Sequence, residues 1–510
     1  MLTGDMLRRS AERFPSKAAI ICDGVKKSYG DLHRDANRFA NAVIDMALAK
    51  GAKIAILSRN RPEYATAFFG ASRTGCVFVN VSVLYALEEL VYVLDKADVE
   101  VLLYEDCFED RVKQAAERLP KLRQAIVIGS ASGDELTLDA LVAKYPDTEP
   151  GVDIEEQDPF CMTYTGGTTG RPKGVLANHR SRAVTAHTVV VESGITEKDV
   201  VAVVTPLFHV AALNIMLQPA VLVGATTVLL PKWDVEEYAK LSRTYGISAA
   251  FMVPTQVSML VSGENFDPEH YSVWTKLNFS GAPMPDWVQK SILEKLPQLR
   301  LTQFYGQSEM GIVAALKSGD LQNKLGSVGR QVYNADLAVL DRDGNPVKPG
   351  EIGEIVARGD NVMLEYYNDP EQTKAFWRYG WAWSGDLATI DADGFLTLVD
   401  RSKDMIIAGG ENIYPKEIEN VLYEHPAVAE CAVFGIPDDK WGEVPAAHVQ
   451  LRAGSDAGEE DLVNHCMERL ARFKRPRLIK LVTDFPKTPI GKIQKNVIRE
   501  DYWAGRDKRI

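Results

Sequence analysis

The sequence predicts an α/β protein with a large N-terminal body and a small α+β domain at its C-terminal end. Short apolar runs alternate with amphipathic stretches from the beginning of the chain, and this pattern changes near residue 400. The 510 residues are 46 % hydrophobic and 25 % charged, so the chain can bury a large core. At ~150 residues per domain, this length corresponds to about three core-sized units.

The body is predicted from strands and helices that alternate along the chain. The apolar runs have the length of strands, whereas the stretches between them repeat apolar residues at helical spacing. Such alternation buries both faces of a sheet and therefore indicates mostly parallel strands. The predicted strands are Ala18–Cys22, Lys53–Leu57, Cys76–Val81, Val99–Tyr104 and Ala125–Ile128, and the predicted helices are Tyr29–Ala49, one that begins near Pro62, Leu87–Leu94 and Phe108–Arg118.

The C-terminal part has a different character. Residues 341–344 and 391–394 are rich in Asp and Gly, which is typical of hairpin turns between short strands. The charged run 400–404 then precedes a compact set of elements. These are the helices Pro415–Tyr423 and Gly458–Ala471 and the strands Ala427–Phe434, Val444–Leu451 and Arg477–Val482. We therefore expect a body over residues 1–400, a hinge over 401–403 and a small α+β domain over 404–510.

Charge and composition disfavour several classes of function. Lys and Arg total 58 against 70 Asp and Glu, and this net charge of −12 disfavours nucleic acid as a partner. The six cysteines form no CxxC pair, and the start of the chain lacks the apolar core of a signal peptide, so we expect a cytoplasmic protein. The most apolar stretch, Val210–Leu230, contains Asn214, Gln218 and Pro219. It predicts a buried helix followed by a buried strand rather than a transmembrane segment.

A loop rich in threonine and glycine is the first segment that indicates chemistry. Residues 164–174 read Tyr-Thr-Gly-Gly-Thr-Thr-Gly-Arg-Pro-Lys-Gly and follow an apolar run, 160–162, that predicts a strand. Glycines let backbone N–H groups approach a ligand, and the threonine hydroxyls and the two cations add further donors. This combination suits a polyphosphate. The loop is not a Walker loop, because no Gly-Lys-Ser/Thr follows at the required spacing.

Together with further motifs in a fixed order, this loop resembles the adenylate-forming superfamily over nearly the whole chain. That superfamily includes acyl-CoA synthetases, peptide-synthetase adenylation domains and firefly-type luciferases. Two positions depart from its pattern, since Gly167 stands where many members have Ser and Ser308 stands where Thr is usual. The further motifs are Pro206-Leu207-Phe208-His209, Ser280-Gly281-Ala282-Pro283, Tyr305-Gly306-Gln307-Ser308-Glu309, Trp383-Ser384-Gly385-Asp386, Asp400-Arg401-Ser402-Lys403-Asp404 with Gly409-Gly410-Glu411-Asn412, and residues 486–492.

The resemblance implies a fold and a reaction in two steps. The body would include a distorted β-barrel subdomain, and the C-terminal domain would be a mobile lid. A small-molecule carboxylic acid attacks the α-phosphate of ATP, which gives an acyl-adenylate and pyrophosphate. A thiol, usually that of coenzyme A, then displaces AMP. ATP and coenzyme A would thus be cosubstrates, Mg²⁺ would be the metal, and a homodimer is the habit of the family.

The resemblance also implies roles for residues of the body. The Thr/Gly loop would hold the β- and γ-phosphates, and Glu309 with Thr165 would hold Mg²⁺, which prefers oxygen ligands. Tyr305 would stack on adenine, and Asp386 with Arg401 would bind the ribose. The implied ATP- and AMP-binding residues are Thr165, Gly166, Gly167, Thr168, Thr169, Gly170, Lys173, Ser280, Gly281, Ala282, Pro283, Tyr305, Gly306, Ser308, Asp386 and Arg401.

The catalytic residues that the resemblance implies are Lys492, His209 and Glu309. Lys492 would bridge the attacking carboxylate and the α-phosphate during adenylation only. Lys403 would be the pivot of the lid, and the pair Gly409-Gly410 would line the path of the coenzyme A arm. His209 would lie between the acyl pocket and the α-phosphate, and a structural core histidine is its alternative reading.

The acyl group is predicted from the residues around His209. Amino-acid-activating relatives place Asp at this position, so a charged amine has no evident partner here. The apolar segments Val210–Leu217 and Ala282–Met284 favour a medium- or long-chain fatty acid, with an aryl or alicyclic acid as the alternative. A short dicarboxylate would need a dedicated arginine, and none stands out in these segments. Three other readings are an acyl-AMP ligase that donates to a carrier protein, a luciferase-type oxygenase and an inactive nucleotide-binding paralogue.

Overall fold

The computed structural model describes residues 1–165, 172–263, 266–282, 284–321, 323–324, 326–401, 403–408, 411–452, 454–487 and 493–504. These residues form two compact units. The larger unit contains the described residues up to 337 together with 357–382, and the smaller unit contains 338–356 and those from 383 onward. The predicted body, hinge and lid are defined as parts that would move about a pivot. Their boundaries stay predictions.

A seven-stranded sheet forms one layer of the larger unit. Its strands, in spatial order, are β18 (Glu365–Tyr366), β8 (Lys173–Asn178), β7 (Pro159–Thr165), β4 (Val77–Asn80), β3 (Lys53–Leu57), β5 (Val99–Glu105) and β6 (Gln124–Ile128). Neighbours from β7 to β6 run parallel, as the alternating pattern predicts. The chain turns back between β7 and β8, which pair antiparallel and so enclose the Thr/Gly loop in a hairpin.

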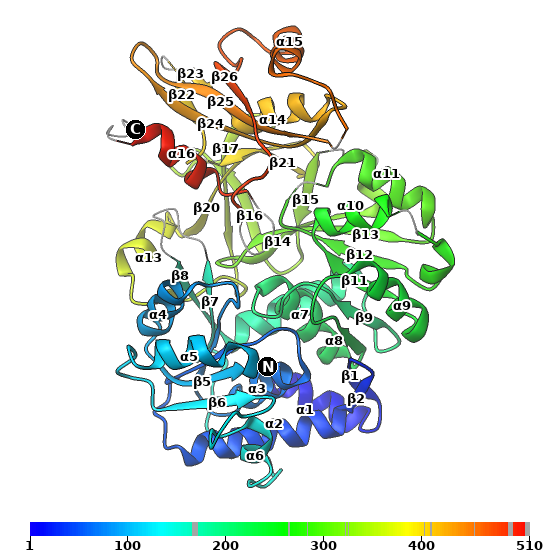
Figure 1. The fold of residues 1–510 in the computed structure, drawn as a ribbon, viewed down its shortest axis with the longest axis vertical. Helices are drawn as coiled ribbons and strands as arrows, with labels where there is room; N and C mark the ends of the chain where they lie inside the picture. The colour runs from blue at the N-terminus through cyan, green and yellow to red at the C-terminus, as the bar shows by residue number, and fades with distance from the viewer. Residues whose placement is uncertain are drawn as a thin grey trace. The chain divides into compact units, whose positions relative to one another are not determined.

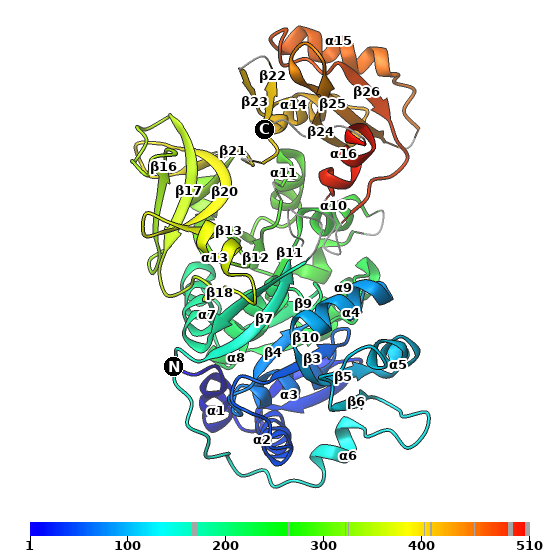
Figure 2. The same cartoon turned by 90° about the vertical axis from the view of Figure 1, so that its left-hand side faces the viewer.

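Helices cover both faces of this sheet (Figures 1 and 2). They are α3 (Pro62–Ala71), α4 (Leu87–Lys96), α5 (Glu109–Ala116) and α7 (His179–Ser193). Apolar side chains of α4 and α5 pack on one face in a single core cluster. On the other face, Phe68 of α3 contacts Phe78 and Phe160, and His179 of α7 stacks on Phe160 at 4.5 Å. Because both faces are buried, these strands read as continuous apolar runs in the sequence.

A second sheet of the larger unit contributes a further row of strands. In spatial order they are β15 (Ser327–Gln331), β14 (Gly311–Lys317), β13 (Arg300–Gln307), β12 (Lys276–Phe279), β11 (Ala249–Met252), β9 (Val200–Val203), β10 (Thr226–Leu229), β1 (Ala18–Cys22) and β2 (Val25–Ser28). Neighbours from β1 to β13 run parallel. Their carboxyl ends therefore meet at one edge, which is where open α/β sheets bind ligands.

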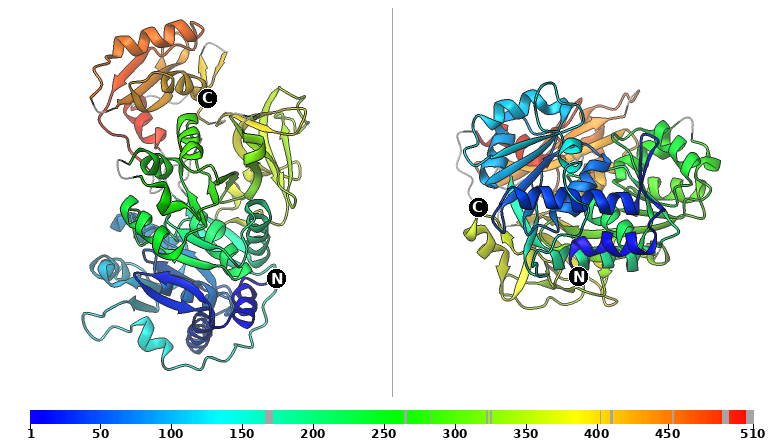
Figure 3. Two further views of the ribbon diagram at one scale, coloured as in Figure 1. Left: turned by 90° about the vertical axis from the view of Figure 1, so that its right-hand side faces the viewer. Right: turned by 90° about the horizontal axis from the view of Figure 1, so that it is seen from below.

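The remaining helices of the larger unit connect these strands. They are α1 (Thr3–Arg13), α2 (Tyr29–Asp45), α6 (Leu138–Val142), α8 (Gln218–Val223), α9 (Val235–Tyr245), α10 (Pro254–Ser262), α11 (Asp286–Lys295), α12 (Ser318–Leu321) and α13 (Pro370–Phe376), with short 3-10 turns at Asp106–Phe108 and Pro268–Tyr271 and the two-residue strand β19 (Trp377–Arg378). Helix α1, which the sequence reasoning did not predict, packs against α2, α3, α7 and α8 (Figure 3). The predicted helix Tyr29–Ala49 ends at Asp45, because Ala47 has a left-handed backbone with φ of 53°.

The apolar stretch Val210–Leu230 folds as predicted. It contains a π-helix, η2 (Ala211–Leu217), then α8, and then the buried strand β10. Every residue of η2 is buried, including Asn214. Among the described residues, no helix combines the length and the apolar character that crossing a membrane requires.

The smaller unit begins with short antiparallel strands. These are β16 (Asp336–Leu340), β17 (Ile352–Arg358), β20 (Trp381–Ile390) and β21 (Leu396–Arg401), which lie in this order. The two predicted hairpin turns are confirmed, since the Asp341 and Asp391 N–H groups donate to the carbonyls of Asn345 and Phe395. A distorted barrel in this region stays a prediction.

The rest of the smaller unit contains the predicted α+β set together with β22, β23 and α16, which the sequence did not predict. Its elements are β22 (Ile406–Ala408), β23 (Glu411–Ile413), α14 (Pro415–Tyr423), β24 (Val428–Asp438), β25 (Gly442–Leu451), α15 (Glu459–Arg469), β26 (Leu478–Leu481) and α16 (Lys495–Trp503). Helices α14 and α15 pack on one face of the sheet, and α16 packs on the other through Phe434 and Ile498. Burial of both faces gives this small sheet a core of its own.

Candidate active site

The ends of the Thr/Gly loop are held by the hairpin of β7 and β8. Thr165 and Lys173 are directly paired across the two strands, so the residues between them leave and re-enter the sheet at one point. Gly166, Gly167, Thr168, Thr169 and Gly170 lie outside the described residues. The pairing nevertheless places the hydroxyl-bearing Thr165 and the cation Lys173 at the two ends of the loop, and both are groups that can donate to a phosphate.

Lys173 is oriented by two residues that are distant in the sequence. Its Nζ donates to Gln372 Oε1 at 2.8 Å and lies 5.1 Å from the centre of the Tyr366 ring. Gln372 belongs to α13, and Tyr366 belongs to β18, which pairs antiparallel with β8. The ammonium group thus lies against an aromatic face, which is the geometry of a cation–π contact.

Glu309 lies in the turn between β13 and β14 and contacts the same tyrosine. The Tyr366 hydroxyl donates to Glu309 Oε1 at 2.9 Å, and the Met363 N–H donates to the Glu309 carbonyl at 2.7 Å. Burial, together with the Glu309 charge, raises the pKa of Tyr366 above its ordinary value, so its hydroxyl stays a donor. Within the described ranges, the Glu309 carboxylate has no second partner. A carboxylate oxygen is the type of ligand that Mg²⁺ prefers, so Glu309 fits a magnesium site.

Tyr366 therefore joins two residues that the sequence assigned to separate motifs. Its ring faces the cation of Lys173, and its hydroxyl binds the carboxylate of Glu309. Sequence reasoning missed this tyrosine. Its only local signal is an aromatic pair, residues 366–367, ahead of the helix start at Asp369 and Pro370, and that signal indicates a strand followed by a helix.

We expect Tyr366→Phe to reduce kcat/KM for ATP about 10- to 100-fold, because a hydrogen bond to a charged group contributes ~1.5–3 kcal/mol. The ring that covers Lys173 would remain. Initial rates of acid-dependent pyrophosphate release at varied ATP and Mg²⁺ measure the effect. Tyr367→Phe is the matched control, since that hydroxyl donates to Asp98 at 3.0 Å instead. Equal losses in both variants would contradict a specific role for Tyr366.

The predicted nucleotide-binding residues follow neighbouring parallel strands. Ser280, Gly281 and Ala282 come directly after β12, and Tyr305 and Gly306 end the adjacent strand β13. Pro283 lies outside the described residues. Gly281 has φ of 93°, which glycine adopts readily, and a β-carbon at Gly306 would collide with the Gly311 carbonyl. The structure thus brings these two motifs to the same edge of the sheet, with Ser308 in the turn that follows.

His209 follows β9, the strand next to β11 in the same sheet. Its N–H donates to the Pro206 carbonyl at 3.0 Å, and its Nδ1 accepts the Ala211 N–H at 3.2 Å. Since Nδ1 is an acceptor, the neutral ring carries its proton on Nε2. The side chain is half-buried at the start of the apolar helix η2.

In the smaller unit, the two predicted ribose-binding residues meet. Asp386 and Arg401 are paired across β20 and β21, and Arg401 Nε lies 3.2 Å from Asp386 Oδ1. Ser384 Oγ accepts the Asp386 N–H at 3.0 Å and donates to the Ile355 carbonyl, so the turn before Asp386 is fixed. Asp386 is only 8 % exposed. A buried carboxylate beside a guanidinium suits the recognition of a diol.

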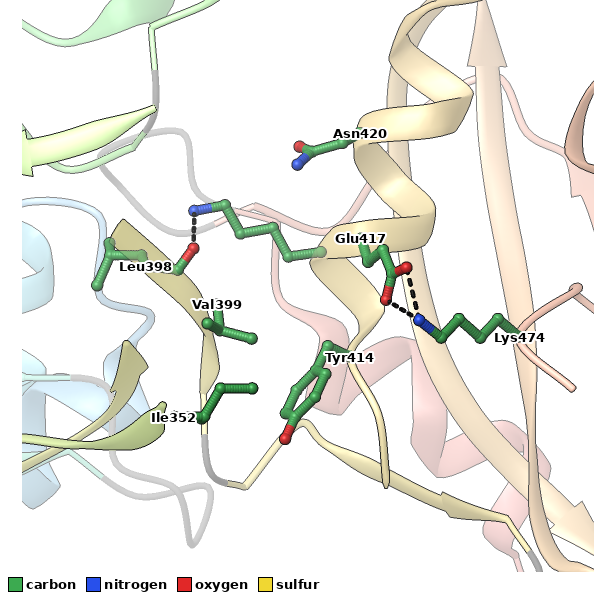
Figure 4. A pocket seen from close by; sticks show the side chains of 8 residues that line it. Ile352, Leu398, Val399, Tyr414, Glu417, Asn420 and Lys474 are labelled. Atoms are coloured by element: carbon green, nitrogen blue, oxygen red, sulfur yellow. Dashed lines mark hydrogen bonds and ion pairs between the residues drawn. The ribbon is translucent and has the colours of Figure 1, made fainter. Parts of the chain in front are cut away.

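A pocket of about 350 Å³ also lies in the smaller unit (Figure 4). Lys416 donates to the Leu398 carbonyl at 3.3 Å, and Lys474 pairs with Glu417 at 2.7 Å. None of the predicted site residues lines this pocket. Its lining residues are Ile352, Leu398, Val399, Tyr414, Lys416, Glu417, Asn420 and Lys474.

The remaining predicted residues belong to the hinge and lid. Lys403 is exposed, and the N–H groups of Asp404 and Met405 donate to the Arg401 carbonyl, which makes a tight turn around it. Gly409, Gly410 and Lys492 lie outside the described residues. Their roles stay predictions.

Comparison with known proteins decides the family. The AMP-binding enzyme family matches residues 7–367, and the AMP-binding enzyme C-terminal domain matches residues 417–492. The chain belongs to the AMP-binding enzymes. The resemblance to the adenylate-forming superfamily is confirmed, and the chain is an AMP-forming acid–CoA ligase by family.

Relatives of this ligase act on different acids. A feruloyl-CoA synthase of an Amycolatopsis species is 34 % identical and covers 97 % of this chain and 98 % of its own. The long-chain-fatty-acid–CoA ligase FadD13 of Mycobacterium tuberculosis is 33 % identical over 98 % of each chain. The crystal structure of the anthranilate CoA ligase AuaEII with anthranoyl-AMP has a TM-score of 0.90 at 27 % identity, and it covers 98 % of this chain and 97 % of its own. The mixed α/β fold with a large body and a small C-terminal domain is thereby confirmed.

Proposed function

We propose that this ligase activates a medium- or long-chain fatty acid with ATP and transfers the acyl group to coenzyme A. The observation that carries the reaction is the meeting of Glu309, Tyr366 and Lys173 beside the entrance of the Thr/Gly loop. A metal-binding carboxylate and a cation, joined by one tyrosine at a phosphate-binding loop, suit the transfer of a nucleotidyl group. Such reactions depend mainly on positioning and on stabilising charge.

In the first step, an oxygen of the acid attacks the α-phosphorus of ATP, and the bond to the β-phosphate oxygen breaks. Pyrophosphate leaves with the electron pair of that bond. Lys173 and the Thr165 hydroxyl would hold the departing phosphates, and Ser308 would donate to the α-phosphate. Lys492 would neutralise the charge that develops between the carboxylate and the α-phosphate. Tyr305, Asp386 and Arg401 would fix the nucleoside.

Glu309, with Thr165, would hold Mg²⁺ in this step. A bound Mg²⁺ neutralises phosphate charge and orients the β- and γ-phosphates. Tyr366 would keep one carboxylate oxygen of Glu309 in place, and the other oxygen would be a ligand for Mg²⁺. In the second step, the thiolate sulfur of coenzyme A attacks the acyl carbonyl, and AMP leaves as its phosphate bond to the acyl group breaks.

The fatty-acid assignment is supported by the segment after His209. All seven residues of η2 are buried, and six of them are apolar, as is Met284 beyond the Ser280 motif. Apolar walls suit an acyl chain, because burying each CH₂ group contributes about 0.8 kcal/mol. An aromatic acid is the second candidate. The feruloyl-CoA synthase, the relative of 34 % identity described above, favours it.

We expect kcat/KM to rise with chain length through the medium-chain fatty acids, about three- to fourfold per CH₂ until the pocket is filled, which is the factor that ~0.8 kcal/mol corresponds to. Coenzyme A-dependent pyrophosphate release measures this series. Benzoate, cinnamate, ferulate and cyclohexane carboxylate form the second arm. If kcat/KM is higher for these acids than for the fatty acids, the substrate is an aryl or alicyclic acid.

The same panel separates the remaining alternatives. Pyrophosphate release without coenzyme A dependence, followed by transfer to a carrier protein, would indicate an acyl-AMP ligase. Light emission with a luciferin would indicate a luciferase-type oxygenase. If no acid supports ATP–pyrophosphate exchange, the chain is an inactive nucleotide-binding paralogue.

A further inference from the structure

A buried asparagine, Asn60, connects the two sheets of the larger unit. It lies between the end of β3 in the seven-stranded sheet and the start of α3. Its side-chain Nδ2 donates to the carbonyls of Thr205 and Leu230, each at 2.9 Å. Its Oδ1 accepts the N–H of Leu207 at 2.7 Å. These three partners are 145, 170 and 147 residues away in the sequence.

Two of these partners follow strands of the second sheet. Thr205 comes after β9, and Leu230 comes directly after β10, the parallel neighbour of β9. Asn60 itself follows β3. One side chain therefore joins the carboxyl end of a strand in the first sheet to the carboxyl ends of two strands in the second. This is the edge at which open α/β sheets bind their ligands.

The third partner, Leu207, belongs to the turn that carries His209. The His209 N–H donates to the Pro206 carbonyl at 3.0 Å, and the Leu213 N–H in η2 donates to the His209 carbonyl at 3.3 Å. The turn thus leads directly into the apolar helix η2. Because Asn60 fixes the Leu207 N–H, it also fixes where His209 and the start of η2 lie.

The amide group of Asn60 is matched to these surroundings. Asn60 is only 3 % exposed, and both its Nδ2 and its Oδ1 bond to backbone groups. A buried polar group that loses its partner costs free energy, because no water replaces that partner. Without this amide, two carbonyls and one N–H of the second sheet would lose a partner at once. The asparagine therefore favours one position of the turn over alternatives.

We propose that Asn60 is a positioning residue for the acid substrate, which holds the turn that carries His209 and the first residues of the acyl wall. This inference rests on the proposed function, in which His209 and η2 border the acyl group. A misplacement of about 1 Å can cost 10²-fold in rate. Lys173 and Glu309, which are assigned to the phosphates and the metal, belong to other segments. Loss of the Asn60 amide therefore acts on the acid more than on ATP.

We expect Asn60→Ala to raise KM for the acid about 10-fold and to lower kcat/KM for it about 10- to 100-fold, with KM for ATP within about threefold of wild type. ATP–pyrophosphate exchange at varied acid and at varied ATP measures both constants. Octanoate is the probe, and ferulate replaces it if the wild-type protein prefers the aryl acids. A role in stability alone would reduce the amount of folded enzyme, which lowers kcat and leaves both KM values unchanged.

A graded variant and a matched control sharpen this test. Asn60→Ser keeps one hydroxyl, which can donate to one of the two carbonyls, so its KM for the acid should lie between those of wild type and Asn60→Ala. Asn37→Ala is the control. The Asn37 amide on α2 is also buried, donates to the Asp147 carbonyl at 2.9 Å and accepts from Arg73. Asn37→Ala should lower the thermal transition but leave KM for the acid and KM for ATP unchanged.

Three outcomes would overturn the inference. They are an unchanged KM for the acid in folded Asn60→Ala, an equal rise of KM for the acid and for ATP, and the same rise of KM for the acid in Asn37→Ala. If Asn60→Ala shows no cooperative thermal transition, Asn60→Ser decides by the same criteria. Failure of the wild-type protein to catalyse exchange with any acid would contradict the proposed function itself, which is a separate result.

Discussion

Lys492→Ala should lower the rate of acyl-adenylate formation by ~10²–10³-fold, because removing one preorganised donor from a developing negative charge typically has that effect. Thioester formation from preformed acyl-adenylate should be largely unchanged, since the implied role of this lysine ends with the first step. ATP–pyrophosphate exchange measures the first half-reaction, and single-turnover transfer to coenzyme A measures the second.

A lysine of the same domain supplies the control for this experiment. Lys480 is exposed on β26, so Lys480→Ala removes an equal charge without touching the site. It should leave both half-reactions at their wild-type rates. If Lys492→Ala reduces the two half-reactions equally, Lys492 is not specific to adenylation and its assignment fails.

Lys403→Pro should leave adenylation within a few-fold of wild type and reduce thioester formation by at least ~10²-fold, since proline fixes φ near −65° and prevents the rotation of a pivot. We expect a large effect because, in the proposed mechanism, the second half-reaction would depend on a second position of the lid. Accumulation of acyl-AMP in the presence of coenzyme A would be its direct sign, measured by quenched-flow chromatography.

Lys403→Ala separates the hinge from the charge at the same position. This variant keeps a rotatable backbone, so both half-reactions should continue at rates close to wild type. Loss of thioester formation in Lys403→Ala would assign the effect to the ammonium group instead. Normal turnover of Lys403→Pro would contradict a pivot at this residue.

The N-terminal sheet and the core of the C-terminal domain could be predicted from local patterns. Strand-length apolar runs separated by amphipathic stretches gave the parallel part of the seven-stranded sheet, and α14, β24, β25, α15 and β26 form within four residues of their predicted bounds. The predictions failed where the local sequence pattern of a helix or of its end is weak. Helix α1 was missed, and α2 ends four residues early because the left-handed backbone of Ala47 stops it.

Some residues of the candidate site were predicted from the sequence, and others were not. Asp386 and Arg401 were assigned to the ribose from separate motifs, and the hairpin of β20 and β21 brings them together. Tyr366 was missed because nothing near it in the sequence indicates a contact with Glu309. The fatty acid assumed from an apolar segment stays a proposal, since an apolar wall also suits an aromatic ring.

The sequence by itself indicated the reaction family of this protein, because seven short motifs occur together in the order that is typical of the adenylate-forming superfamily. Only the tertiary structure decided which distant side chains support those motifs. Gln372 reaches Lys173 from 199 residues away, and β18 reaches β8 to bring Tyr366 beside it. Local patterns specify strands and helices, but the order in which strands pair depends on the packing of the whole chain.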